Sequence, residues 1–321
     1  MSLGKTLLSK ILITGGLGFI GGALAEKLAV DDYDICCLDP KAAAMRTTAM
    51  PCMEYMAGSI SDDATLKVAF EGAVACVHLA GSSVIENPRL NAETSPEPFL
   101  EAASRLFAAA AHRNVPVIYA SSATVYGQVG AELIKESDLA APINAHGEEK
   151  LIFETLAHQF NISHGLPTVG LRMFNIYGAN QSPASPYCGV LRLAVQAVAD
   201  REPVTIHGDG SHLRDFVHVD DVVRFIRMLL ARPLSGAERV NVCTGRGLSV
   251  NDVVSMVAVA SGCNIEKTFV DTVSDGVASS VGDPGFARDR YGFEAAISAE
   301  MGIADTVSAV FGAPGRARGR A

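Results

Sequence analysis

Several sequence features that would mark membrane, secreted or nucleic-acid-binding proteins are missing from this chain of 321 residues. No apolar stretch approaches the length of a membrane-spanning helix, and the N-terminus has no signal-peptide pattern. An excess of positive charge is also lacking, since the net charge is −9. This balance argues against nucleic acid or an anionic membrane as the main partner. Internal repeats and low-complexity core segments are absent as well.

Paired cysteine motifs are lacking too. The seven cysteines form an odd, scattered set with no C-x-x-C spacing, and several lie in apolar runs. We interpret them as reduced core residues, which predicts a cytoplasmic protein. They are Cys36, Cys37, Cys52, Cys76, Cys188, Cys243 and Cys263.

What is present is an ordinary globular composition, with 49% hydrophobic and 19% charged residues. Short apolar runs alternate with amphipathic segments. Strands are expected at Lys10–Thr14 and at residues 34–39, 52–57, 74–80, 116–121 and 168–174. Helices are expected at Phe19–Val30, from about residue 62, at 98–113 and at 150–160. This alternation predicts an α/β fold, a Rossmann-type doubly wound parallel sheet with helices on both faces.

The pattern changes after Tyr177. A turn-rich segment at 178–189 precedes an expected helix, Val190–Asp200, and a short strand, Val204–His207. We predict a smaller α/β substrate domain made of residues 179–215 and 247–312. Residues 1–178 and 216–246 then form the nucleotide-binding domain, and 313–321 form a solvated tail.

A glycine-rich stretch, ITGGLGFIGG at residues 13–22, lies between the first expected strand and helix. Gly15, Gly18 and Gly21 allow a sharp turn and let a pyrophosphate approach backbone N–H groups at a helix N-terminus. Asp39 ends the next strand, 18 residues after Gly21. An acid there accepts hydrogen bonds from the adenosine ribose and repels a 2′-phosphate. The stretch therefore predicts NAD as the cofactor.

Polar residues that can act on a substrate follow later in the chain. Ser122 ends the fifth strand, where side chains of this fold class face the ligand crevice. His146 and Lys150 are four residues apart, so one turn of a helix places them on the same face. Ser122 can instead cap local backbone, and His146 can be a solvated helix residue; the residues alone leave both alternatives open.

Motifs along nearly the whole chain resemble the extended short-chain dehydrogenase/reductase family, the NAD-dependent nucleotide-sugar epimerases and dehydratases. The second half is most similar to the UDP-sugar 4-epimerases. The motifs, in family order and spacing, are TGGLGFIGG, Asp39, VHLAG, SSATVYG, LRMFNIYG, SPYCGV, IHGDGSHLRDFVHVDDV and GRGLSV.

The resemblance implies a catalytic Ser, Tyr and Lys. The Ser position matches Ser122 and the Lys position matches Lys150, but the family's Tyr falls on His146. Lys150 is then expected to bind the nicotinamide ribose and His146 to act as a weakened base. Tyr126 or Thr124 is an alternative proton acceptor.

The same resemblance implies the binding residues. Asn175 and Arg214 are expected on the nucleotide-sugar diphosphate, and Ser122 and Thr124 on the sugar. The expected cofactor residues are Gly15, Gly18, Phe19, Ile20, Gly21, Asp39, Ser59, Ile60, Leu79, Ala80, Gly81 and Lys150.

Departures from the family keep other functions open. Residues 94–99 replace the family's Asn-x-x-Gly-Thr, and residues 272–286 lack the usual diphosphate arginines. The favoured function is 4-epimerisation of a UDP-sugar. An NAD-binding protein with weak or no catalysis and an NAD-dependent sugar dehydrogenase are the alternatives. A dehydratase is disfavoured because Ala123 and Thr124 stand where that group places an Asp-Glu pair.

Two predictions concern other partners. His207, His212 and His218 have irregular spacing, so we predict no metal site. Family resemblance implies a homodimer built from the helices at 98–113 and 146–160.

Overall fold

The computed structural model describes residues 9–31, 33–44, 52–81, 97–128, 130, 132–183, 188–271, 277 and 279–311. The chain divides into two compact units. Unit 1 comprises Met1–Ser122, Ala145–Arg172 and Val223–Val240, and unit 2 comprises Ala123–Asn144, Met173–Val222 and Asn241–Ala321. No helix among the described residues is long and apolar enough to cross a membrane.

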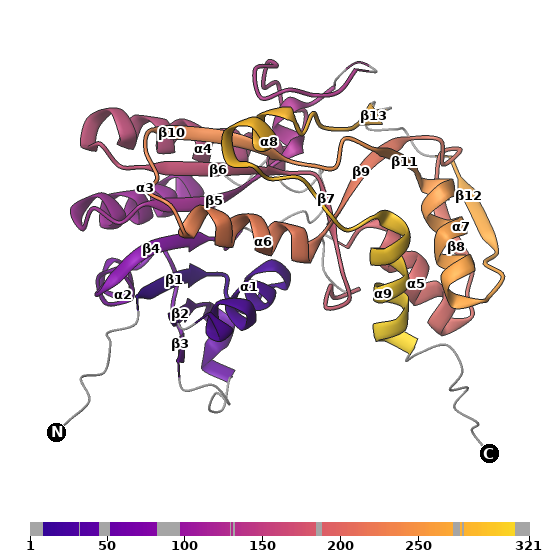
Figure 1. The fold of residues 1–321 in the computed structure, drawn as a ribbon, viewed down its shortest axis with the longest axis horizontal. Helices are drawn as coiled ribbons and strands as arrows, with labels where there is room; N and C mark the ends of the chain where they lie inside the picture. The colour runs from indigo at the N-terminus through magenta and orange to yellow at the C-terminus, as the bar shows by residue number, and fades with distance from the viewer. Residues whose placement is uncertain are drawn as a thin grey trace. The chain divides into compact units, whose positions relative to one another are not determined.

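Unit 1 carries a seven-stranded sheet in the order β10-β6-β5-β4-β1-β2-β3 (Figure 1). The pairings from β3 through β2, β1 and β4 to β5 are all parallel. The order 3-2-1-4-5-6, extended by β10, is the doubly wound arrangement that the sequence predicts. The strands are β1 (Lys10–Thr14), β2 (Asp34–Leu38), β3 (Met53–Met56), β4 (Ala73–His78), β5 (Val117–Ser122), β6 (Thr168–Met173) and β10 (Ala237–Val242).

Helices of unit 1 cover the sheet because each carries an apolar stripe that must be buried. α3 packs against both α2 and α4, and Arg227 of α6 forms an ion pair with Asp31, directly after α1, at 2.6 Å. The buried core includes Leu12, Phe107 and Phe153. The helices are α1 (Phe19–Val30), η1 (Pro40–Ala44), α2 (Asp63–Ala69), α3 (Glu97–His112), α4 (Ala145–His164) and α6 (Val219–Leu230), whose first turn belongs to unit 2.

Most strands of unit 2 are shorter than those of unit 1. The unit has its own core around Tyr177, Phe216 and Val254. β9 lies at its centre and pairs with β7, β11 and β13, while β8 pairs with β12. The elements are η3 (Ala123–Tyr126), β7 (Asn175–Tyr177), α5 (Val190–Asp200), β8 (Val204–His207), β9 (Leu213–His218), β11 (Gly247–Ser249), α7 (Val250–Ser261), β12 (Lys267–Val270), β13 (Ser279–Ser280), α8 (Gly285–Tyr291) and α9 (Ala299–Phe311).

The unit boundaries differ from the domain boundaries that the sequence predicts. Residues 123–144, 173–178, 216–222 and 241–246 group with unit 2. β7–β9 pairing binds the segment after β6 to this unit. The Asp215 carboxylate also accepts hydrogen bonds from Thr244 and Gly245. These strand pairings and hydrogen bonds join residues that are far apart in the sequence. They therefore leave no compositional signal at the unit boundary.

Candidate active site

The glycine loop after β1 leaves no room for side chains at two positions. Gly15 has φ +72°, and a Cβ there would lie 2.7 Å from the backbone nitrogen of Ala80. A Cβ on Gly21 would lie 2.2 Å from the carbonyl oxygen of Gly15. The Gly18 N–H donates to that same oxygen at 2.9 Å. The turn can therefore be built only with glycine, and its backbone stays accessible to a ligand.

The N-terminus of α1 follows this turn directly. Its N-cap residue is Gly18, which has no side chain to cap the helix, and its first turn has no acidic residue. The backbone N–H groups at the start of a 12-residue helix, from Phe19 and Ile20 onward, can therefore receive an anion. Together, the close-packed glycine cradle and the uncapped helix fit a dinucleotide pyrophosphate.

Asp39 follows β2, beside the glycine loop. It is buried, and its carboxylate accepts hydrogen bonds from the backbone N–H of Leu17 at 3.2 Å and of Lys41 at 2.9 Å. The Leu17 contact fixes the acid against the glycine turn. A carboxylate oriented in this way can accept hydrogen bonds from the two hydroxyls of an adenosine ribose.

The segments after β3 and β4 lie beside this frame. The Ser59 hydroxyl accepts from the Ser61 N–H at 3.2 Å, next to Ile60 in the turn before α2. Asp62 caps α2, accepting from the Thr65 N–H at 2.9 Å, so its carboxylate supports the helix. After β4, the Leu79 N–H donates to the Thr14 carbonyl at 3.0 Å.

Leu79, Ala80 and Gly81 thus continue the edge that begins at the glycine loop. Ala80 touches the position of the missing Gly15 Cβ, and its N–H donates to the Thr14 hydroxyl at 3.4 Å. Gly81 is exposed. These three residues form a wall on which a dinucleotide can pack.

Ser122 and the His146–Lys150 pair also belong to unit 1. Ser122 ends β5, the strand next to β4, and is half-buried. Lys150 is buried with 8% of its surface exposed, while His146, one turn earlier on α4, is half-buried. The structure therefore brings the candidate catalytic strand end and the candidate cofactor edge to the same end of the parallel sheet.

The electrostatics of this cluster keep both of its histidines neutral. Burial, reinforced by the nearby Lys150 charge, lowers the pKa of His146 to about 4. The same two causes lower the pKa of His78, at the end of β4, to about 3. Burial lowers the pKa of Lys150 to about 8, against a smaller opposing effect from Glu149. At neutral pH, Lys150 therefore carries the charge and His146 can accept a proton.

His78 was not among the predicted site residues. Its Nδ1 lies 2.6 Å from the Thr14 hydroxyl, and its ring stacks on Phe153 of α4 with centroids 4.8 Å apart. It therefore connects β1, β4 and α4 immediately beside Lys150. The available signal was a histidine at the carboxyl end of a buried strand, within the VHLAG motif.

Tyr126, the alternative proton acceptor, is buried and has a hydrogen-bonded hydroxyl. Its ring is 1% exposed, and its hydroxyl donates to the Asn241 side-chain oxygen at 2.6 Å. Asn241 in turn donates to the Ile134 carbonyl at 2.8 Å. This buried chain of hydrogen bonds, wholly within unit 2, commits the tyrosine to structure. Thr124, two residues earlier on η3, is half-buried.

Unit 2 contains the two predicted diphosphate residues. The Asn175 side-chain amide on β7 donates to the Asp215 carbonyl at 3.1 Å, which fixes its orientation. Arg214 on β9 lines a groove of about 720 Å³ between α5 and β8, together with Val190, His207 and His212. A guanidinium at the wall of a groove can pair with phosphate oxygens.

His207, His212 and His218 all belong to unit 2. Among the described residues, no group of three His, Cys, Asp or Glu side chains is placed to hold a metal ion. His218 instead packs edge-on against Tyr177, with ring centroids 5.3 Å apart.

A parallel sheet in this strand order, with a glycine cradle and an acid after the second strand, defines a dinucleotide-binding enzyme of the Rossmann class. The family model "NAD dependent epimerase/dehydratase family" matches residues 11–243. The chain therefore belongs to this family, and NAD is its cofactor.

Individual relatives agree with this assignment. A Bacillus subtilis (strain 168) protein described as an uncharacterized UDP-glucose epimerase, YtcB, is 28% identical over 314 residues, 93% of this chain and 97% of its own. The UDP-glucose 4-epimerase of Thermus thermophilus, solved with NAD, is 26% identical with a TM-score of 0.84 over 95% of this chain and 99% of its own. That of Thermotoga maritima, solved with UDP-glucose, is 27% identical with a TM-score of 0.85 over 94% and 98%.

Proposed function

We propose that this enzyme is a 4-epimerase of a UDP-sugar, acting through a transient 4-keto sugar. One observation carries the proposal. Four neighbouring parallel strands, β2, β1, β4 and β5, carry the candidate residues at their carboxyl ends: Asp39, the glycine loop and Leu79 follow the first three, and Ser122 ends β5. In this fold class that edge binds the dinucleotide and the reacting substrate together. Similarity to the UDP-glucose 4-epimerases supports the choice of substrate class.

The protein's residues divide the chemistry among them. When bound, NAD supplies a reversible two-electron oxidant for the C4 carbinol of the sugar. His146 accepts the proton of the C4 hydroxyl and later returns it. Ser122 donates a hydrogen bond to the same oxygen as it becomes a carbonyl. Lys150 binds the nicotinamide ribose, and its charge makes the oxygen easier to deprotonate.

Binding residues are assigned on the same proposal. Thr124 and Ser122 contact the sugar, while Asn175 and Arg214 hold the diphosphate. Arg214 suits this role because its charge is permanent and its donors match phosphate oxygens. The residues proposed to hold NAD are Gly15, Gly18, Phe19, Ile20, Gly21, Asp39, Ser59, Ile60, Leu79, Ala80, Gly81 and Lys150.

The deciding experiment incubates the purified protein and NAD with UDP-glucose, UDP-galactose and their uronic-acid and N-acetyl counterparts. We expect interconversion of 4-epimers by chromatography, with no accumulation of absorbance from NADH. Net NADH formation would identify a dehydrogenase instead. A thermal shift with NAD, without turnover or a shift from any nucleotide sugar, would identify a non-catalytic binding protein.

The low pKa of His146 favours slow turnover. A pKa of about 4 for the protonated form of His146 is far below neutral pH. His146 therefore has little driving force to accept the proton of the sugar hydroxyl. An NAD-binding protein with weak catalysis is therefore the second candidate. It predicts epimer formation only over many hours at high protein concentration.

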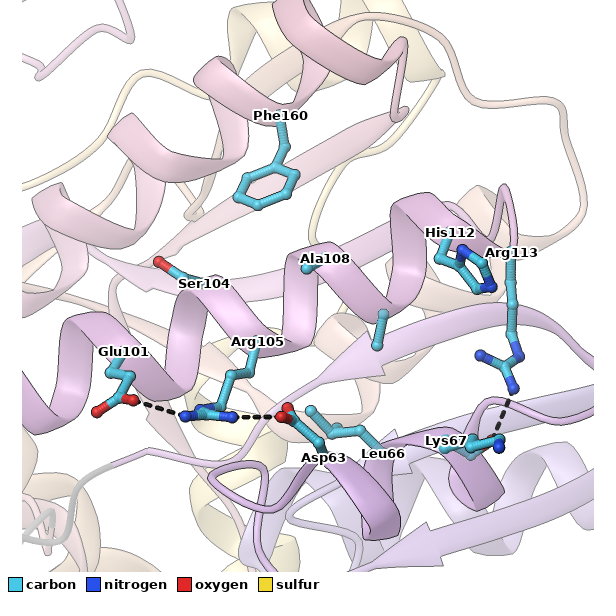
Figure 2. Close-up of a pocket in the computed structure, with 11 residues that line it drawn as sticks. Asp63, Leu66, Lys67, Glu101, Ser104, Arg105, Ala108, His112, Arg113 and Phe160 are labelled. Carbon is cyan, nitrogen blue, oxygen red and sulfur yellow. Dashed lines mark hydrogen bonds and ion pairs between the residues drawn. The ribbon is translucent and has the colours of Figure 1, made fainter.

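We also propose that two copies assemble through α3 and α4. A groove of about 630 Å³ runs between α2, α3 and α4, with Leu66, Ala108 and Phe160 among its apolar lining. Figure 2 shows Arg105 at its rim, bridging Glu101 of its own helix and Asp63 of α2. Leu100, 40% exposed and two turns before Ala108, extends the same helix face. A second copy of the helix pair would cover these apolar surfaces.

Sedimentation tests the assembly directly. Ala108→Arg places a charge on the exposed face of α3 and is expected to convert a dimer to a monomer. Val30→Arg, at a 73% exposed position in α1, is the matched control and is expected to leave the mass unchanged.

The seven free cysteines, none in a disulfide, support the cytoplasm as the compartment.

A further inference from the structure

A fully buried charge network in unit 1 has no part in the assignments above. The Glu154 carboxylate on α4 accepts two hydrogen bonds from Arg172, from Nε at 2.9 Å and from Nη2 at 2.7 Å. It accepts a third from the Ser121 hydroxyl at 2.6 Å. Ser121, Glu154 and Arg172 are only 4%, 2% and 2% exposed.

The network joins the two elements that carry the candidate catalytic residues. Ser121 directly precedes Ser122 on β5, and successive strand residues point to opposite faces. Ser121 faces the helix layer, where its hydroxyl meets Glu154 of α4, so Ser122 points to the opposite face of the sheet. Glu154 lies one turn beyond Lys150 on the same buried face of α4. Arg172 comes from β6, the strand next to β5.

Stability alone does not account for three buried polar groups at this place. Desolvating an ion pair costs free energy that its attraction only partly recovers, and apolar replacements of similar volume are often neutral or stabilising. The surroundings are apolar, since Phe153 and Ala157 beside Glu154 belong to the core. A forked guanidinium–carboxylate contact, in contrast, has a defined direction and fixes where a helix can sit.

We propose that Glu154 is a positioning residue that holds α4, and with it Lys150 and His146, in register with the Ser122 end of β5. Arg172 orients the Glu154 carboxylate, and Ser121 transmits the contact to the strand. Helix sliding by about 1 Å is enough to cost about a hundredfold in rate when reacting groups are misplaced. Where it concerns turnover, this inference rests on the proposed epimerase function; where it concerns Lys150 and NAD, it does not.

Ser121→Ala is the sharpest test because it removes only the hydrogen bond between β5 and Glu154 and leaves the Glu154–Arg172 ion pair intact. We expect kcat to fall by about 10- to 100-fold while KM for the sugar nucleotide changes little, because alignment acts in the transition state. Thr306→Ala is the matched control: it removes one buried hydroxyl hydrogen bond, to Gly302 at 2.8 Å, within unit 2. It is expected to lower Tm without changing kcat.

A second variant separates positioning from folding. Glu154→Met combined with Arg172→Met replaces the pair by apolar side chains, and we expect a folded protein whose Kd for NAD rises at least about tenfold, because Lys150 is no longer held. Leu229→Ala, a buried position on α6, provides a variant of lowered Tm for comparison. Glu154→Asp, which keeps the charge, is expected to recover part of the kcat lost in Glu154→Gln.

The outcomes distinguish the two proposals. If the double variant and Ser121→Ala both retain the wild-type Kd for NAD and kcat, or lose them only as far as Leu229→Ala does at equal loss of Tm, the positioning role is overturned. If the wild-type protein shows no epimerisation but the double variant still loses NAD affinity, the proposed function fails and the positioning role stands.

Discussion

His146 lies one turn before Lys150 on α4, and two causes lower its pKa to about 4. Burial is the larger cause, and the positive charge of Lys150 is the smaller one. The pair therefore consists of a cation and a neutral imidazole at neutral pH. In this state the imidazole is available as a proton acceptor, but its proton affinity is low. The position that is expected to hold the catalytic base is the one whose side chain is least suited to it.

His146→Tyr is expected to raise kcat for 4-epimerisation by about tenfold or more, since a well-matched general base contributes about 10²–10⁴. A tyrosinate beside Lys150 is stabilised by the positive charge, whereas an imidazolium is destabilised by it. Initial rates at saturating UDP-sugar and NAD measure the effect. His146→Ala is the companion variant: if it keeps the full wild-type rate, His146 is not the base.

Lys150→Met is expected to abolish turnover and weaken NAD binding while raising the free energy of unfolding at pH 7. Burial lowers the lysine pKa from 10.5 to about 8, so keeping its charge in the folded state costs up to about 3 kcal/mol below pH 8. Between pH 8 and 10.5 the unfolded chain binds the proton that the folded chain has released, so this lysine's unfavourable contribution changes with pH only in that window. Denaturant titrations of the wild-type protein and Lys150→Met measure their free energies of unfolding. The difference between the two should shrink as pH rises from 8 to 10.5. A constant difference would contradict the assigned cost.

Gly21→Ala is expected to eliminate NAD binding, because its Cβ would lie 2.2 Å from the Gly15 carbonyl oxygen. The adjacent Gly22→Ala is the matched control, since its Cβ would have the Gly16 oxygen at 3.8 Å as its nearest neighbour. In a helix that change stabilises by about 0.5–1 kcal/mol. Calorimetric titration with NAD and thermal unfolding compare the two variants; equal NAD affinity would argue against the glycine cradle as the binding site.

Asp39→Asn is expected to weaken NAD binding by about 10- to 100-fold, because hydrogen bonds to a charged acceptor contribute about 1.5–3 kcal/mol. Loss of the negative charge also removes repulsion of a 2′-phosphate, so the preference for NAD over NADP should fall. The ratio of the two dissociation constants is the measurement. Asp62→Asn provides the comparison: its carboxylate caps α2, asparagine caps equally well, and the ratio should not move.

Sequence patterns predicted six of the seven strands of the sheet in unit 1 and missed β10. β1, α1, α5 and β8 have the predicted bounds, because Gly18, the αL residue Arg201 and neighbouring turns stop the periodic patterns sharply. α4 begins at Ala145, one residue before the helix predicted at 146–160, and continues four residues beyond its predicted end, to His164. The strands that were not predicted are β7, β9, β10, β11, β12 and β13. Among them, β7, β11 and β13 have only two or three residues, which carry no measurable period.

The site was only partly predictable. Glycine spacing and Asp39 predict a dinucleotide cradle because its chemistry requires particular residues at fixed places along one segment. Glu154 and Arg172 carry no such signal: charged residues in a helix and a strand normally predict solvent exposure, and only their meeting in three dimensions shows that they are buried. Tyr126 illustrates a different limit, since its proximity to Ser122 in sequence makes it a candidate base but does not show its hydrogen-bond partner. Its hydroxyl is bound to Asn241, 115 residues away.

The distribution of thiols makes the protein simple to label. Burial raises the pKa of Cys36 to about 11 and of Cys37 to about 12, so both are protonated and poor nucleophiles at neutral pH. Cys263, two residues after the end of α7 in unit 2, is the exposed cysteine. A maleimide fluorophore added to the unmodified chain should therefore react first at that position, giving a labelled protein without engineered residues.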